Sequence, residues 1–173
     1  MNLQPAGFSL ITNHQSPVLV VARIAEGLQS LAVTLWVGAL WSVGLMVAPT
    51  LFHFIQDRML AGSIAGRLFT YTALIGLGCG IYLLLFRLAR FGGTAFRHGF
   101  FWVTLTMVIV AAIGQFGVQP ILEGLRAQAL PRQVMEGVLR DRFATWHGVA
   151  SVLYVIECAL GVALVWLQSR APN

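Results

Sequence analysis

Long apolar stretches, separated by short polar and charged segments, dominate the pattern along this chain. Four of them are long enough to cross a bilayer core of about 30 Å as helices, which takes roughly 20 residues each. They cover residues 31–52, 68–86, 99–122 and 143–167. Each is apolar around its circumference, unlike a half-buried soluble helix, and none alternates like a barrel strand. The pattern predicts an all-α integral membrane protein, a four-transmembrane-helix bundle forming a single membrane domain over 1–173.

The segment between the third and fourth stretches is expected to contain further helix. Apolar residues keep helical spacing beyond Pro120, and they do so again after Pro131. The second of these runs comprises Val134, Met135, Val138 and Leu139. We expect the third helix to extend out of the membrane and a short extramembrane amphipathic helix to follow the break at Pro131.

Composition agrees with a chain solvated by lipid. Of the 173 residues, 58% are hydrophobic and 10% charged, and the mean hydropathy is +0.80, whereas soluble domains are about a quarter charged. The net charge of +5 comes entirely from arginine, since the chain has no lysine. Positive loops suit the anionic headgroups of the lipid bilayer. We expect no nucleic acid partner, because no soluble segment interleaves basic and aromatic residues.

The distribution of arginine predicts how the bundle is oriented. Four crossings place both termini on one side, together with the short loop between the second and third stretches. That loop has Arg87, Arg90 and Arg97 and no acidic residue, whereas the long loop on the other side spreads its arginines over more positions. The positive-inside rule then favours both termini in the cytoplasm.

Small residues in the second stretch indicate close helix packing. Gly76 and Gly80 are one helical turn apart, and Gly38 with Ser42 makes a weaker step in the first stretch. Such small faces allow helices to approach closely in lipid. Cys79 and Cys158 fall inside apolar stretches, and we interpret them as small buried hydrophobic residues rather than as a disulfide or metal pair.

Polar residues gather toward the face that carries the two longer loops. Because polar groups at membrane depth cost free energy, such residues should face the bundle interior. The cluster comprises Arg67, Gln115, Gln119, Arg126, His147, Ser151 and Tyr154. We favour a structural hydrogen-bonded network, and a site for a small molecule, an ion or a cofactor at the same place is the alternative.

Glu157 is the acidic residue nearest the middle of the bilayer. It follows His147 by ten residues, about 15 Å at 1.5 Å per residue. An isolated carboxylate at such depth is too costly, so Glu157 is expected to be protonated or paired. It could hydrogen-bond a neighbouring helix or subunit, which we favour, or belong to a proton or cation pathway.

Histidine positions offer only a sparse set of metal or haem ligands. A haem that transfers electrons typically needs two axial ligands at similar depth, and His53 with His147 is the candidate pair. No phosphate-binding loop, dinucleotide fingerprint or nucleophile elbow is present. We expect no cofactor and no dedicated metal site, with haem b or copper at His53 and His147 as the alternative.

The ordered set of motifs resembles a bacterial family of four-helix membrane proteins known as domain of unknown function family 4149, itself similar to the eukaryotic transmembrane protein 205 family. The motifs are residues 48–52, 61–62 with 65–69, 115–120 with 125–126, and Phe143, 147–148 and 151–154. Together they cover about 22–166. The resemblance implies a multi-pass protein of the bacterial inner membrane without a settled activity, and the eukaryotic relatives are associated with drug resistance and export.

Three functions from different classes follow from these observations. We favour a non-catalytic accessory or assembly subunit that packs against other membrane protein subunits or forms a homo-oligomer, because four helices leave little room for a transport path. The first alternative is an export or permeation element for a small solute, proton or metal, using the polar cluster with Glu157. The second is a haem- or copper-binding membrane oxidoreductase. The favoured interpretation is not an enzyme.

Overall fold

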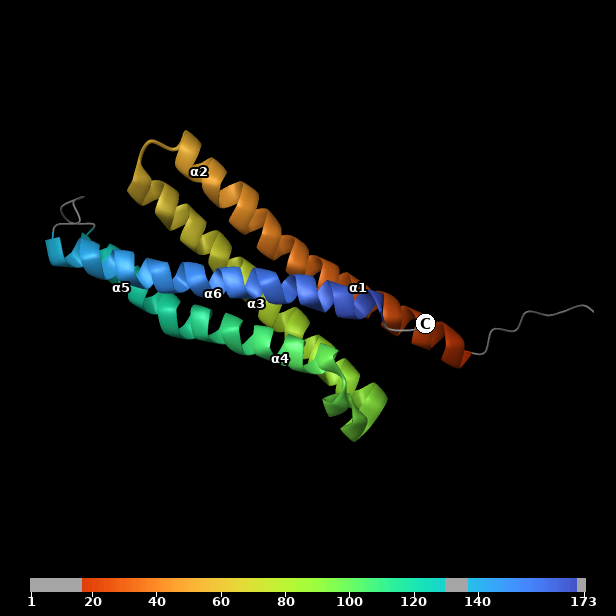
Figure 1. The fold of residues 1–173 in the computed structure, drawn as a ribbon. Helices are drawn as coiled ribbons and strands as arrows, with labels where there is room; N and C mark the ends of the chain where they lie inside the picture. The colour runs from red at the N-terminus through yellow and green to blue at the C-terminus, as the bar shows by residue number, and fades with distance from the viewer. Residues whose placement is uncertain (1–16, 130–136, 171–173) are drawn as a thin grey trace, which may run out of the picture.

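Four long helices joined by short connections make up the described protein (Figure 1). The structure, a computed structural model, describes residues 17–129 and 137–170. The helical stretches long and apolar enough to cross a membrane are Arg23–Phe54, Arg58–Arg97, Gly99–Gln128 and Gly137–Ser169. The described residues contain no strand. The predicted all-α four-helix membrane bundle is confirmed, and each helix is longer than the apolar stretch that predicted it.

The first and third long helices each pass through a proline without ending. The first comprises α1 (Pro17–Trp41), the π-helical turn η1 (Ser42–Val47) and α2 (Ala48–Phe54). The third comprises α4 (Gly99–Ala112), the π-helical turn η3 (Ile113–Val118) and α5 (Gln119–Ala129). Proline has no N–H to donate, and its ring clashes with the carbonyl four residues earlier. Pro49 and Pro120 directly follow the two wide turns, which accommodate them within continuous helices.

The second long helix, α3 (Arg58–Phe91), is defined by clear signals at both ends. At its start the Asp57 carboxylate accepts hydrogen bonds from the backbone N–H groups of Met59 (2.9 Å) and Leu60 (3.1 Å), which is a side-chain N-cap. At its end Gly92 has a φ of 52°, a conformation that favours glycine. The 3₁₀ turn η2 (Gly92–Arg97) then leads into α4, so α3 lies antiparallel to both of its chain neighbours.

The core lies where α1, α3, α4 and α6 (Gly137–Ser169) meet. Its centre is Trp36, which is fully buried, and whose indole packs against the backbone at Gly76 and Gly80. The predicted close packing at this glycine step is therefore confirmed. Gly38, in contrast, has open space where a side chain would be, so the weaker step in α1 does not pack on another described helix.

The two halves of α6 have different neighbours. The C-terminal half packs on α1, where Gln168 Nε2 donates to Ser30 Oγ (2.8 Å) and Gly161 lies against Val37. The N-terminal half lies beside α5 and diverges from α2 (Figure 1). This divergence opens the bundle at the end that carries α2 and α5.

The predicted short amphipathic helix after Pro131 falls mainly on residues 130–136, outside the described residues. Its last two apolar members, Val138 and Leu139, lie in the first turn of α6 and continue directly into the fourth long helix. The predicted extension of the third helix beyond Pro120 corresponds to α5.

Candidate functional site

A cavity of about 990 Å³ lies between the first long helix and α6. Residues from η1 and α2 form one wall and residues from α6 the other, while α3, η3 and α5 provide the floor. Its walls are mostly apolar, with polar side chains distributed along them, among them Gln115, Ser151 and Tyr154. This volume is at the upper end of what small-molecule sites enclose, about 300–1,000 Å³.

Both π-helical turns face this cavity. Gly44 and Leu45 from η1 and Gly114 and Gln115 from η3 are among its lining residues. π-Helical turns inside α-helices occur frequently at functional sites, because the wider turn changes which side chains face inward. The two proline-associated turns, one in the first long helix and one in the third, therefore both line the same cavity.

The end of the cavity near the α2–α3 and α5–α6 connections is positively charged. Arg58, Arg126 and Arg140 all line this end. Arg126 lies close against α3: its Nη1 is 2.5 Å from the position that a Cβ on residue 66 would occupy. The Cζ of Arg126 also lies 5.5 Å from the centre of the Phe143 ring, a cation–π distance. Phe143 in turn stacks on His147, with ring centroids 5.8 Å apart.

Gln119 connects α5 to α3 beside Arg126. Its amide Nε2 donates to the backbone oxygen of Gly66 (3.1 Å) and to the hydroxyl of Thr70 (3.2 Å). Gln115, one turn earlier, lines the cavity, and no side-chain hydrogen bond joins it to another described residue. The two glutamines therefore have different surroundings, one bonded between helices and one facing the cavity.

Tyr154 fixes α6 to the first long helix at the level of η1. Its hydroxyl donates to the backbone oxygen of Leu40 (2.5 Å), the acceptor that the Gly44 N–H would use in a regular α-helix. Its ring packs directly on Gly44, where any side chain would collide with it. Ser151, one turn before Tyr154, donates to the carbonyl of His147 in its own helix (2.8 Å).

Glu157 lies deep in the cavity, which continues along α6 to Ala159 and Val162. The residue is only 6% exposed, and the Trp36 indole is beside its carboxyl group. Neither Glu157 Oε1 nor Trp36 Nε1 has a well-aligned hydrogen-bond partner among the described residues. Buried polar atoms are nearly always hydrogen-bonded. These two atoms are therefore an exception, and they make this part of the mostly apolar cavity locally polar.

The structure brings most of the predicted polar residues together. Those that line the cavity are Gln115, Gln119, Arg126, His147, Ser151, Tyr154 and Glu157. Arg67 does not line it and is exposed on α3. Sequence reasoning missed Arg58 and Arg140, which resemble the ordinary arginines that flank membrane spans. It also missed Gly44, because the need for glycine there depends on a tyrosine from another helix.

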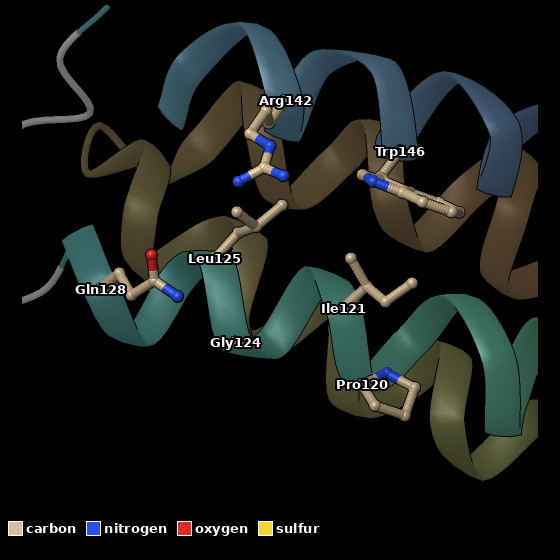
Figure 2. Close-up of a pocket in the computed structure, with 7 residues that line it drawn as sticks. All are labelled: Pro120, Ile121, Gly124, Leu125, Gln128, Arg142 and Trp146. Atoms are coloured by element: carbon tan, nitrogen blue, oxygen red, sulfur yellow. The ribbon is translucent and has the colours of Figure 1, made fainter. Parts of the chain in front are cut away.

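A second, smaller depression of about 260 Å³ lies between α5 and α6 outside the main cavity. Figure 2 shows the Arg142 side chain extending from α6 toward Leu125 of α5, with Trp146 farther along α6. An arginine and a tryptophan near the end of a span are typical of the membrane interface. This depression contains none of the buried polar groups of the main cavity.

The two histidines considered as metal or haem ligands have different surroundings. His147 lines the cavity, whereas His53 is exposed in α2, with its ring 5.1 Å from that of Phe54. Within residues 17–129 and 137–170, no three His, Cys, Asp or Glu side chains are grouped closely enough to hold one metal ion. Cys158 lines the cavity, and both cysteines are free thiols.

These features define a multi-pass, four-helix membrane protein with a large cavity that is cationic at one end. The chain belongs to the family described as Domain of unknown function (DUF4149), whose sequence profile matches residues 31–131. The match begins within α1, covers the rest of the first three long helices and ends before α6. No curated protein and no solved structure matches the chain.

Proposed function

We propose that this protein binds a lipid-like amphiphile in the cavity between α2 and α6, as the membrane-embedded binding element of an export or permeation process. The distribution of charge in the cavity supports this most, because the cavity has arginines at one end, a mostly apolar body and a single buried acid, Glu157, deep inside it. A molecule with a polar head and a long apolar tail matches that arrangement.

The depth of the cavity supports an occupant taken from the bilayer. The α6 residues that line it run from Arg140 to Val162, and the part between His147 and Glu157 covers about 15 Å of the helix axis. That part alone is about half of a hydrocarbon core of about 30 Å. A lipid-like molecule in the cavity could keep its head at headgroup level and its tail at tail level. Entry between α2 and α6, which diverge at this end, requires no passage through water.

This proposal differs from the accessory subunit favoured from sequence. That preference rested on the small space inside four helices, and a cavity of about 990 Å³ removes the objection. An accessory role stays as a second candidate because Gly38 and Gly78 both have open space above them, which suits close contact with another membrane helix. Gly78→Leu, which does not touch the cavity, should then abolish a co-purifying subunit or homo-oligomer.

Photo-cross-linking tests the proposed binding. The protein would be placed in nanodiscs with a phospholipid that carries a diazirine on one acyl chain, irradiated and mapped by peptide mass spectrometry. We expect adducts on cavity residues such as Val110 and Leu153. Adducts confined to outward-facing residues such as Trp102, which is 53% exposed, would contradict the proposal.

Two glycines of η3 provide a matched pair for this experiment. Gly114 and Gly117 both have open space where a side chain would be, but only Gly114 lines the cavity. Gly114→Phe should therefore remove the cavity adducts while the adducts on the outer surface persist. Gly117→Phe, which adds the same ring to the same turn, should leave both sets unchanged.

A further inference from the structure

The arginine end of the cavity specifies the charge of the molecule that enters it. We propose that the occupant is an anionic phospholipid of the bilayer, with its phosphate held by Arg126 and flanked by Arg58 and Arg140. This inference rests on the proposed function and names the class of ligand for the same cavity.

Arg126 lies between α3 and α6 in surroundings that suit phosphate recognition. Contact with Gly66 limits one side of its guanidinium group, and the Phe143 ring lies within cation–π distance of it. A guanidinium group carries five donors in a planar fork, which matches two phosphate oxygens at once. These contacts on two sides of the guanidinium group restrict the side chain before a phosphate binds, which reduces the side-chain freedom lost on binding.

The surrounding charges favour an anion. Among the described residues, no carboxylate forms an ion pair with Arg58, Arg126 or Arg140. The nearby Asp57 carboxylate caps α3. The charge of Glu123 acts on Arg126, but Glu123 does not line the cavity. Three positive groups at the rim of a low-dielectric cavity therefore create a field that attracts a negative headgroup.

The position of the arginines favours a lipid over a free phosphate. All three lie near the ends of spanning helices, where phospholipid phosphates are found, and the apolar walls extend from them toward Glu157. A free phosphate would leave those walls exposed to water. A phospholipid fills both regions at the depths that its head and chains already have in the bilayer.

Competition among lipids with identical chains tests this inference. Protein reconstituted with equal amounts of phosphatidylglycerol, phosphatidylcholine and a trimethylammonium-headed lipid would be released for native mass spectrometry, and the retained lipids compared. We expect phosphatidylglycerol to be retained in preference to both others. Arg126→Gln should lower the phosphatidylglycerol-to-phosphatidylcholine ratio about tenfold, since a hydrogen bond to a charged group has roughly that effect on affinity.

Arg67→Gln is the matched control, because Arg67 is an exposed arginine of α3 that does not line the cavity. It should leave the ratio unchanged. The ratio is measured within one sample, so partial loss of folded protein does not affect it. Retention of all three lipids in equal amounts, or an Arg126→Gln ratio equal to that of the unmodified protein, would overturn the headgroup assignment and leave the proposed binding intact. No retained lipid of any kind would overturn the proposed function itself.

Discussion

At the scale of single residues, glycines two positions apart in α3 have opposite surroundings. Gly76 lies under the Trp36 indole with no space for a methyl group, whereas Gly78 is exposed with nothing within 4 Å of a Cβ position. The four-residue step from Gly76 to Gly80 could be recognised in the sequence as a packing face. The sequence does not say which helix faces this step, so it could not show that the partner is a fully buried tryptophan.

We predict that Gly76→Ala destabilises the protein and Gly78→Ala does not. A methyl group at residue 76 would displace Trp36, and overpacking of this kind typically costs about 1–3 kcal/mol. At residue 78 the same change meets no atom and gains helix propensity, worth up to about 1 kcal/mol. Thermal unfolding in one detergent, followed by circular dichroism, would compare the two variants. Equal melting temperatures would contradict the packing described for Trp36.

At the scale of elements, two proline-associated π-helical turns shape the cavity. The prolines and the polar residues near them are visible in the sequence, and so is their common position near one membrane face. The wide turns themselves could not be predicted, because a proline can equally end or kink a helix. Tyr154 of α6 helps to hold η1 in place, because its hydroxyl donates a hydrogen bond to the backbone oxygen of Leu40 in α1.

The polar residues of η3 and α5 allow a test that separates structural from cavity-facing groups. Gln119→Ala removes two hydrogen bonds to α3, and hydrogen bonds in membrane proteins average about 0.6 kcal/mol. We expect a loss of about 1 kcal/mol in unfolding free energy, measured by steric trapping or denaturant titration. Gln115→Ala should change stability by less than half of that amount. A larger loss at Gln115 would indicate a buried network there instead of a ligand-facing amide.

At the scale of the whole molecule, the sequence predicts the number of helices and their order well because lipid imposes strict rules on length and polarity. It predicts the site less completely. The polar cluster is predicted from its depth alone. Depth does not show that α6 diverges from α2 at one end and that a cavity lies between them. Arg67 illustrates the limit: it carries the same charge as the cavity arginines and neighbours Gly66, which Arg126 approaches, but it is exposed and does not line the cavity.

The orientation of the molecule in the membrane is a prediction at the same scale. We propose that both termini lie in the cytoplasm, because Arg87, Arg90 and Arg97 surround the α3–α4 connection and positive loops remain inside. In a Cys79→Ala/Cys158→Ala background, a membrane-impermeant maleimide added to intact cells should label Ala129→Cys but not Gly93→Cys. After cell lysis both should be labelled. The reverse pattern in intact cells would invert the assignment and place the cavity's arginine end at the cytoplasmic face.

The proposed function depends on a lipid-like molecule in the cavity between α2 and α6. A cryo-electron microscopy map of the protein in a lipid nanodisc, with a rigid binding protein attached to increase its size, would test this directly. We expect one elongated density that is broadest beside Arg126 and extends along α6 toward Glu157, with α2 and α6 apart. A map in which α6 closes against α2, with no density between them, would contradict it.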